Sequence, residues 1–361
     1  MRVVTVLGTR PEIIRLSTVI PKLDEAVDHI LVHTGQNYDN KLSDIFFEDL
    51  GVRTPDIYLG VDTSSFGVQI GQIITGCEKV FSEKKPDAVL ILGDTNSGLS
   101  AFVAKRMGIP VYHMEAGNRC YDDRVPEEVN RRVIDHSSSI LMPYTNRSKE
   151  NLVAEGIPSR RIYVTGNPIF EVLNHFEDKI DSSTAMNSYG VVKGEYFLAT
   201  LHRAENVDIP ERLEGFAKAL EMVRSKFNLP MIVSTHPRTR NKLNSFALEK
   251  KLGNVKYMEP MGFFDFVNLE KNAKCVLSDS GTVQEECCIF KVPTVTLRDV
   301  TERPETIDCG SNVLAGGNPD KILELTELVT SSSPSWDPPS EYLAPDVSST
   351  VVRIVTGYLH D

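Results

Sequence analysis

Residues 88–97 read Ala-Val-Leu-Ile-Leu-Gly-Asp-Thr-Asn-Ser, an apolar run that changes to polar residues halfway. The same order recurs at Val3–Leu7, which leads into Gly-Thr-Arg-Pro-Glu at 8–12, and at Cys275–Ser278, which leads into Asp-Ser-Gly-Thr at 279–282. Each run has strand length and precedes a helical pattern, which indicates strands buried on both faces of a parallel sheet with crossover helices. Because ligands of open α/β sheets bind at the carboxyl ends of strands, we expect the site at these polar clusters.

This alternation extends over the chain in two consecutive series. In the first series we expect strands at 2–7, 29–33, 87–92, 110–114, 139–143 and 161–164, and helices at 10–26, 39–50, 66–84, 97–107, 126–138, 146–156 and 169–177. In the second we expect strands at 195–201, 230–234, 255–258, 274–278, 293–297 and 312–315, and helices at 209–227, 240–251, 263–271, 282–290, 303–309, 319–331 and 347–359.

Polar segments separate the two series and follow the second. Residues 178–187 indicate a connection between domains, and residues 331–345, rich in Ser and Pro, indicate a loop. We therefore expect an α/β protein with two Rossmann-like, doubly wound domains that face each other across a cleft. The N-terminal domain is predicted at 1–168 and the C-terminal domain at 169–346, with a last helix at 347–361 that packs back on the first domain.

Composition limits the classes of function. The 361 residues suffice for about two domains, and 41% hydrophobic and 25% charged residues are ordinary for globular proteins. A net charge of −11 argues against nonspecific nucleic-acid binding, which needs a basic surface. No apolar run approaches the length of a membrane span, and Met1 leads directly into a strand rather than a signal peptide. Six cysteines without a CxxC pair indicate reduced thiols in a cytoplasmic protein.

The first polar cluster carries cations. Arg10 and Arg15 lie at the start of the first helix, where backbone N–H groups and the helix dipole favour a phosphate. An ordinary strand-to-helix turn with surface arginines explains the segment about equally well. The chain contains no GxGxxG sequence, which argues against a nicotinamide cofactor.

Three carboxylates follow strands or open a helix in the first half: Asp94, Glu115 and Glu127. Each has an ordinary explanation, because Asp caps helices and Glu127 can pair with Arg131 four residues later. Three such groups in one domain nevertheless favour a site for acid–base chemistry.

In the second half, two histidines at strand ends are each followed within two residues by an arginine. His202 stands before Arg203, and His236 stands two residues before Arg238. This pairing suggests an anion site, and a zinc site is not expected because no third ligand stands at a suitable spacing.

The last cluster has the features of a nucleotide site. Ser280, Gly281 and Thr282 open a helix whose N–H groups can hold a phosphate, and Glu286, just over one turn on, can accept hydrogen bonds from ribose hydroxyls. Arg303 supplies a further cation. Among Phe263, Phe264 and Phe266, we expect two side chains to lie in the hydrophobic core and one to stack on a base.

Together these motifs resemble one family over essentially the whole chain. Gly-Thr-Arg-Pro-Glu, Gly-Asp-Thr, Glu-Ala-Gly, Pro-Glu-Glu with Asn-Arg, His-Arg, Asp-Ser-Gly and Thr-Glu-Arg-Pro-Glu are similar, in order and spacing, to the non-hydrolysing UDP-N-acetylglucosamine 2-epimerases. The resemblance implies the GT-B arrangement, a homodimer, a UDP-amino sugar as substrate, and neither cofactor nor metal.

The resemblance also implies a mechanism, anti elimination of UDP to a 2-acetamidoglycal followed by readdition with C2 inverted. It makes Asp94, Glu115 and Glu127 the acid–base groups and His202 the group that stabilises or protonates the leaving phosphate. It also gives the residues expected to bind UDP: Arg10, Arg15, Arg131, His236, Phe266, Ser280, Gly281, Thr282, Glu286 and Arg303.

Some residues depart from the simplest members of the family. Arg15 stands where those members carry Lys, residues 118–125 replace a Gly-rich, Trp-containing stretch, and Ala204 follows the His-Arg pair. The stretches 113–120, 234–238 and 277–282 resemble a branch that converts UDP-2-acetamido-2,6-dideoxy-L-talose to UDP-N-acetyl-L-fucosamine for capsule or O-antigen. The alternatives are a UDP-N-acetylglucosamine 2-epimerase, a GT-B glycosyltransferase, a hydrolysing epimerase and a nucleotide-sugar sensor.

Overall fold

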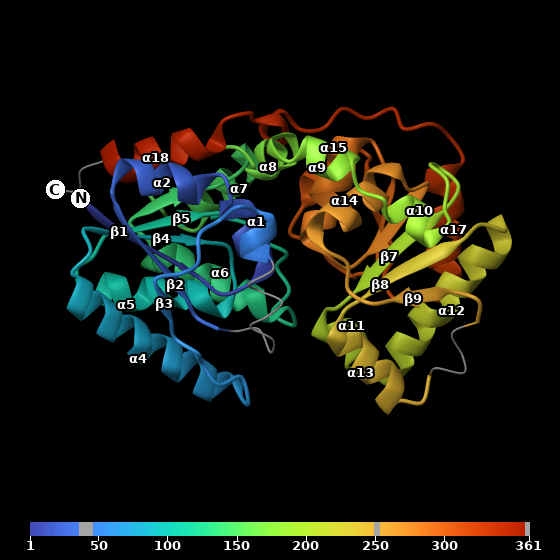
Figure 1. Cartoon of the computed structure of the whole chain (residues 1–361), viewed down its shortest axis with the longest axis horizontal. Coiled ribbons are helices and arrows are strands. Elements are labelled where there is room, and N and C mark those ends of the chain that lie inside the picture. The colour runs from blue at the N-terminus through green and yellow to red at the C-terminus, as the bar shows by residue number, and fades with distance from the viewer. Residues whose placement is uncertain (36–45, 249–252, 358–361) are drawn as a thin grey trace. The chain divides into compact units, whose positions relative to one another are not determined.

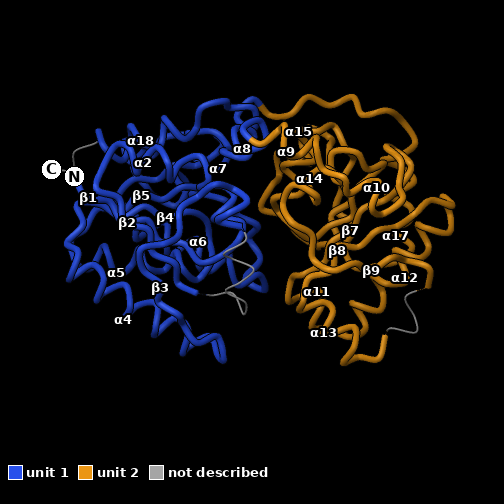
Figure 2. Tube along the Cα trace, in the orientation of Figure 1, with its two compact units in different colours: residues 1–175, 340–361 blue, residues 176–339 orange. Residues whose placement is uncertain are grey.

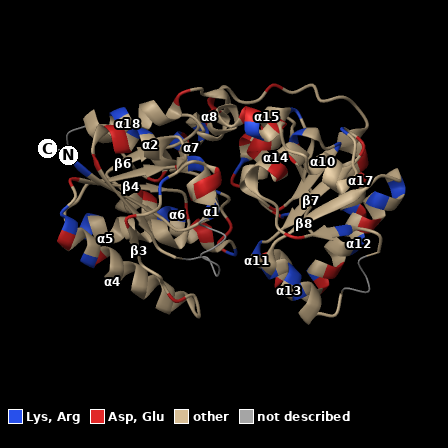
Figure 3. Ribbon diagram, viewed as in Figure 1, with Lys and Arg blue, Asp and Glu red and all other residues tan. Residues whose placement is uncertain are grey.

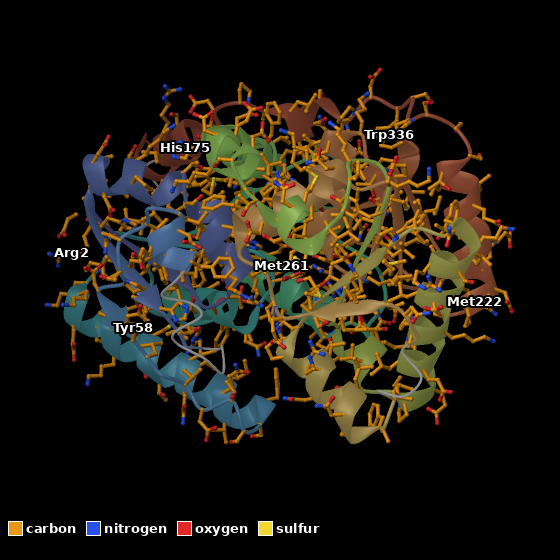
Figure 4. The ribbon with its side chains drawn as sticks, turned by 45° about the vertical axis from the view of Figure 1, so that its right-hand side comes forward. Arg2, Tyr58, His175, Met222, Met261 and Trp336 are labelled. Carbon is orange, nitrogen blue, oxygen red and sulfur yellow. The ribbon has the colours of Figure 1, made fainter. Side chains whose placement is uncertain are left out.

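The computed structural model describes residues 1–35, 46–248 and 253–357. The chain forms two compact units, Met1–His175 with Ser340–Asp361 and Phe176–Pro339 (Figure 2). The first unit thus extends past the predicted boundary at 168 and ends at His175, which Figure 4 labels.

The first unit is built on a six-stranded parallel sheet in the order β3-β2-β1-β4-β5-β6 (Figure 1). The strands are β1 (Arg2–Leu7), β2 (Asp28–His33), β3 (Ile57–Tyr58), β4 (Ala88–Leu92), β5 (Val111–Met114) and β6 (Ile140–Met142). The register places Val6 opposite Ile91 and Leu92 opposite Met114. Strand order reverses between β1 and β4, so the turns after these strands lie at the switch point where such sheets bind ligands.

Helices cover both faces of this sheet. They are α1 (Arg10–Leu16), α2 (Val19–Ala26), α4 (Phe66–Lys84), η1 (Asn96–Leu99), α5 (Ser100–Arg106), α6 (Pro126–Ser137), α7 (Asn146–Ala154), η2 (Ser159–Arg161), α8 (Ile169–His175), η4 (Ser340–Leu343) and α18 (Val347–Gly357). Side chains of α4, α5 and α6 pack on Val4, Val6 and Ile91. On the other face α18 lies beside α2 (Figure 1), and Lys22 bonds Asp346 at 2.9 Å.

The second unit repeats the topology of the first, with strand order β12-β11-β10-β7-β8-β9. Its strands are β7 (Phe197–Leu201), β8 (Met231–Thr235), β9 (Lys256–Met258), β10 (Cys275–Ser278), β11 (Thr294–Thr296) and β12 (Asn312–Leu314). All its ladders are parallel, so the turns after β7 and β10 lie at the equivalent switch point.

Alternate residues of β7 face two different cores in this unit. The helices are α9 (Glu177–Asp181), α10 (Ala185–Tyr189), α11 (Ala204–Val207), α12 (Pro210–Phe227), α13 (Pro237–Ser245), α14 (Phe263–Asn272), α15 (Gly281–Phe290), α16 (Pro304–Asp308) and α17 (Pro319–Thr330). Phe197 and Ala199 pack with α12 and α17, whereas Leu198 packs with α14 and α15. Trp336, labelled in Figure 4, donates from Nε1 to the carbonyl oxygen of Cys288 at 3.0 Å.

Three predicted elements are wrong. The helix predicted at 10–26 breaks into α1 and α2, because Pro21 lacks an N–H and would clash with the preceding turn of a continuous helix. The strand predicted at 161–164 is η2 followed by a single bridge between Ile162 and Leu141. The connection predicted at 178–187 contains α9 and α10, because buried apolar residues, Ile180 among them, anchor it to the unit.

Other differences concern the ends of elements. The short strand β3 escaped prediction because two residues carry too little pattern to recognise. Helix α13 begins at Pro237 rather than 240, since Pro is favoured in a first helical turn. The predicted helices 39–50, 240–251 and 347–359 reach residues outside the described ranges; of the first, residues 46–49 are described and helical.

Candidate active site

Two of the predicted carboxylates stand on consecutive turns at the carboxyl edge of the first sheet. Asp94 follows Gly93, which has φ +77°, and Glu115 itself has φ +65°. The N–H of Gly93 donates to the Met114 carbonyl at 3.0 Å, so the two turns are joined through the backbone. The left-handed conformation is unfavourable for a residue with a side chain, and such residues cluster at functional sites.

Each of these carboxylates is paired with an arginine. Arg131 Nη2 lies 2.5 Å from Asp94 Oδ2, and the Arg15 guanidinium bonds Glu115. Glu115 also accepts hydrogen bonds from Tyr144 and Asn118, each at 3.3 Å. We expected both arginines to bind UDP; the structure pairs them with Asp94 and Glu115 of their own unit, and their role toward a nucleotide stays a prediction.

The third carboxylate, Glu127, is half-buried in the first turn of α6. Its neighbour Glu128, which the sequence did not distinguish from it, is fully buried and accepts the N–H groups of Cys120 and Tyr121 at 3.0 and 3.1 Å. Burial alone would raise the pKa of Glu128, but hydrogen bonds from Cys120 and Arg131 outweigh it and lower that pKa. Glu128 therefore anchors the segment before α6, and Glu127 is the more exposed of the two carboxylates.

A further buried carboxylate connects the turns after β1 and β4. Glu12 is 1% exposed and accepts hydrogen bonds from Gly8 N, Thr9 Oγ1 and Ser97 Oγ at 3.1, 2.7 and 2.6 Å. Burial raises the pKa of Glu12 to about 7. The sequence places Glu12 in the Gly-Thr-Arg-Pro-Glu motif but carries no sign of this role, which depends on a partner 85 residues away. Arg10, also in this turn, lies over the Phe46 ring, and burial lowers its pKa.

In the second unit, Asp279 organises the turn after β7. It is fully buried and accepts the backbone N–H groups of His202 and Arg203 and the Asn206 amide, with His202 Nδ1 at 3.1 Å. Burial would raise the pKa of Asp279, but the interactions with His202 and Asn206 outweigh it and hold that pKa far below its usual range. The carboxylate keeps a proton on His202 Nδ1 and directs Nε2 away from Asp279.

The predicted His–Arg anion site is only partly formed. The rings of His202 and His236 lie 6.0 Å apart, so the two histidines come together. Their arginines turn elsewhere, because Arg203 bonds the Asp279 carbonyl and Glu302 while Arg238 pairs with Asp208. His236 also caps α13, since its Nδ1 accepts the N–H of Arg238 at 3.2 Å. These pairings could not be predicted, because a linear sequence does not reveal which carboxylate an arginine meets.

The start of α15 carries the expected phosphate-binding residues. Ser280 is the N-cap residue and makes no side-chain capping bond, and Gly281 and Thr282 follow in the first turn. A Cβ at position 281 would lie 2.7 Å from Glu302 Oε1, so any larger residue would displace this buried side chain from its pair with Arg298. Arg303 is buried against α15 and bonds Glu285.

Glu286 and Phe266 come from neighbouring helices of the same core. Glu286 is 4% exposed, and it lies close enough to the fully buried Glu270 to influence it. Burial, and then the neighbouring Glu286, raises the pKa of Glu270 well above its usual value. Figure 3 shows this concentration of acidic residues on α14 and α15. Phe263 is buried, whereas Phe264, which packs on Phe176, and Phe266, which packs against the core, are both partly exposed.

Among the described residues, no group of three or more His, Cys, Asp or Glu side chains is arranged to hold a metal ion. Within the same ranges, no helix has both the length and the apolar character needed to cross a membrane.

Comparisons with known proteins connect these features to one family. The family model described as UDP-N-acetylglucosamine 2-epimerase matches residues 21–356. The UDP-N-acetylglucosamine 2-epimerase of Methanocaldococcus jannaschii is 42% identical over 347 residues, which cover 94% of this chain and 95% of the relative. A Pseudomonas aeruginosa UDP-2,3-diacetamido-2,3-dideoxy-D-glucuronate 2-epimerase is 36% identical over 329 residues, 90% of this chain and 91% of the relative.

The solved structures agree with this result. The M. jannaschii enzyme in complex with UDP-N-acetylglucosamine and UDP superposes with a TM-score of 0.93 at 40% identity, covering 99% of each chain. The two α/β units with parallel sheets thus have the GT-B-like fold that the sequence predicts.

Proposed function

Because the chain belongs to the UDP-N-acetylglucosamine 2-epimerase family of non-hydrolysing enzymes, we propose that it interconverts UDP-N-acetylglucosamine and UDP-N-acetylmannosamine. The observation that carries the proposal is the pair of adjacent turns that present Asp94 and Glu115, each with its own arginine. Inversion at an unactivated carbon needs groups that remove and return a proton, and paired carboxylates suit that task.

The 6-deoxy sugar expected from residues 118–125 and 236–238 has less support. Asn118 bonds Glu115, Arg119 pairs with Asp135 and Glu155, and the Cys120 N–H bonds Glu128. These contacts lie within the unit and account for residues 118–120 without a sugar. The relatives described above carry names for other UDP-amino sugars, which favours UDP-N-acetylglucosamine over UDP-2-acetamido-2,6-dideoxy-L-talose.

In the proposed reaction, a carboxylate takes the C2 proton while the bond between C1 and the phosphate oxygen breaks. The C–H electron pair forms the C1–C2 double bond, and UDP leaves with the electrons of the C–O bond. Readdition of UDP at C1 and of a proton on the opposite face of C2 completes the inversion. We assign proton transfer to Asp94, Glu115 and Glu127.

We assign nucleotide binding to residues of the second unit and to Arg10 of the first. We propose that the backbone at Ser280, Gly281 and Thr282 binds the diphosphate, since a helix start presents N–H groups and positive dipole charge. His202, oriented by Asp279, stabilises the charge on the leaving phosphate. The remaining assignments are His236 and Arg303 for the diphosphate, Glu286 for the ribose and Phe266 for the uracil.

Two further proposals concern the state of the protein. We propose a homodimer, because Phe66 of α4 and Phe102 of α5 are 66% and 49% exposed and large apolar side chains favour burial in an interface. We also propose a cytoplasmic location, which the six free cysteines support.

Incubation with UDP-N-acetylglucosamine in heavy water tests the function. Proton NMR should show UDP-N-acetylmannosamine that carries deuterium at C2. Free N-acetylmannosamine with released UDP would indicate a hydrolysing epimerase, and transfer to an added acceptor would indicate a glycosyltransferase. A higher kcat/KM for UDP-2-acetamido-2,6-dideoxy-L-talose would restore the 6-deoxy sugar as the substrate.

A further inference from the structure

A buried histidine lies beneath the two turns that carry Asp94 and Glu115. His113, in β5, is 1% exposed. Its Nε2 lies 2.9 Å from the carbonyl oxygen of Gly93, and its Nδ1 lies 2.8 Å from Asp135 Oδ1. The ring thus joins the residue before Asp94 to helix α6.

Both partners of the ring can only accept hydrogen bonds. A carbonyl oxygen has no proton to give, and an ionised carboxylate has none either. Asp135 is ionised, because its Oδ2 accepts the N–H of Gly117 at 3.2 Å and pairs with Arg119 Nη2 at 2.8 Å. Two contacts of 2.8 and 2.9 Å between acceptors and ring nitrogens therefore require a proton on each nitrogen.

We propose that His113 is a buried imidazolium that holds the turns of Asp94 and Glu115 in register, and so acts as a positioning residue for proton transfer at C2. This inference rests on the proposed function for its catalytic consequence, although the protonation of the ring does not depend on it.

The charges around the ring alternate in a way that suits a cation. Asp135 accepts from His113 on one side and pairs with Arg119 Nη2 at 2.8 Å on the other. Arg119 in turn forms two hydrogen bonds with Glu155, at 2.8 and 2.6 Å, toward the surface. Arg119 shares its single charge between Asp135 and Glu155, so a protonated ring at His113 supplies the second cation that balances the two carboxylates.

The same network also holds the turn after Glu115. Asp135 Oδ2 accepts the N–H of Gly117 at 3.2 Å. Gly117 has φ +80°, and a Cβ there would lie 2.2 Å from the Ser148 carbonyl oxygen, so its backbone is held close to α7. His113 and Asp135 therefore join the Gly93 carbonyl, on the Asp94 side, to the Gly117 N–H, on the Glu115 side.

The effect on the reaction should be in turnover rather than in nucleotide binding. A misplacement of ~1 Å in a reacting group can cost ~10²-fold in rate. His113→Gln offers only one donor group and one acceptor group at its amide, so it cannot donate to both partners. The groups proposed to bind UDP, apart from Arg10, Arg15 and Arg131, lie in the other unit.

The first measurement reads the ring itself in the wild-type, full-length protein. With histidine labelled by ¹⁵N, both ring nitrogens of His113 should show one-bond couplings to protons at pH 7.5, and His113→Gln assigns the signals. An unprotonated nitrogen on His113 would overturn the proposal whatever the enzyme's substrate proves to be.

The second measurement is kinetic. His113→Gln should lower kcat for UDP-N-acetylglucosamine by ~10²-fold and change the affinity for UDP, measured by calorimetry, less than twofold. His175→Gln, at the exposed end of α8, is the matched control and should leave both unchanged. Asp135→Asn keeps the shape but removes the charge partner, and should lower kcat similarly.

Normal kcat in folded His113→Gln and Asp135→Asn, or a parallel loss of UDP affinity, would exclude the positioning role. If wild-type protein epimerises no UDP-sugar, the proposed function fails, while the NMR result still decides the protonation of the ring. If neither variant folds, through-bond experiments on the wild-type protein assign the His113 signals, and their couplings decide the proposal.

Discussion

Asp94 and Asp279 occupy equivalent places in the two units, whose sheets have the same strand order. Asp279 directly follows β10, and Asp94 follows β4 with Gly93 between them. Asp94 keeps 20% of its side chain exposed and meets one arginine, Arg131. Asp279 is fully buried and accepts hydrogen bonds from backbone and side chains around the turn after β7. The same position in the fold therefore supplies a group that can react in one unit and a group that orients its neighbours in the other.

The largest effect should come from Asp94→Asn. If Asp94 transfers a proton, its amide should lower kcat by ~10²–10⁴-fold and leave UDP affinity unchanged. NMR of C2 deuterium incorporation and calorimetry with UDP measure the two quantities. Asp28→Asn, at an exposed surface pair with Arg2, is the control. Turnover within a few-fold of wild type would mean that Asp94 serves, like Asp279, only to organise its turn.

Asp279→Asn should affect stability as well as turnover. The substitution leaves buried donors imperfectly paired, which costs ~1–3 kcal/mol in unfolding free energy. The folded-state pKa of Asp279 lies below its unfolded value, so its stabilisation is present above ~pH 4 and is lost as pH falls below that value. Urea unfolding at pH 7 and pH 3.5 should therefore show a smaller loss on acidification for Asp279→Asn than for wild type. An equal loss would contradict the ionised, orienting role.

Gly281→Ala tests the close approach of the Glu302 side chain to α15. Because its Cβ would lie 2.7 Å from Glu302 Oε1, we expect UDP to bind ~10-fold more weakly, about 1.4 kcal/mol. Gly262→Ala, which meets nothing within 4 Å, is the matched control. Calorimetry measures the affinity of each variant for UDP, and equal affinities would remove Gly281 from the proposed diphosphate site.

The smallest effect is expected for Glu12, whose contribution to stability should change with pH in the direction opposite to that of Asp279. Its pKa of about 7 in the folded protein exceeds the ordinary value, so its stabilisation is full below ~pH 4 and is lost as pH rises through 7. Glu12→Gln keeps the acceptor for Gly8 and Thr9 and should change stability at pH 5 by less than ~1 kcal/mol. Denaturant curves at pH 5 and 8 should show a smaller loss with rising pH than in wild type. An unchanged pH dependence would mean that Glu12 is ionised throughout.

The period of the apolar pattern was enough to predict most of the fold. Strands such as Ala88–Leu92 are apolar along their whole length because both faces are buried, and helix 66–84 is predicted with the bounds it has in the structure. The failures occur where one residue or a distant contact decides. Pro21 divides the first helix, and Ile162 makes a single bridge where a strand was expected.

The sequence by itself determined the two alternating series and the placing of polar residues at strand ends, because both follow from local periodicity and from the edge at which parallel strands end. Only the tertiary structure decided which charge meets which. Arg15 reaches Glu115 across 100 residues, and Glu12 reaches Ser97 across 85. Glu128 rather than Glu127 is buried, and His113 lies between two acceptors. Such pairings depend on distances and burial that exist only once the strands have assembled, so no local pattern encodes them.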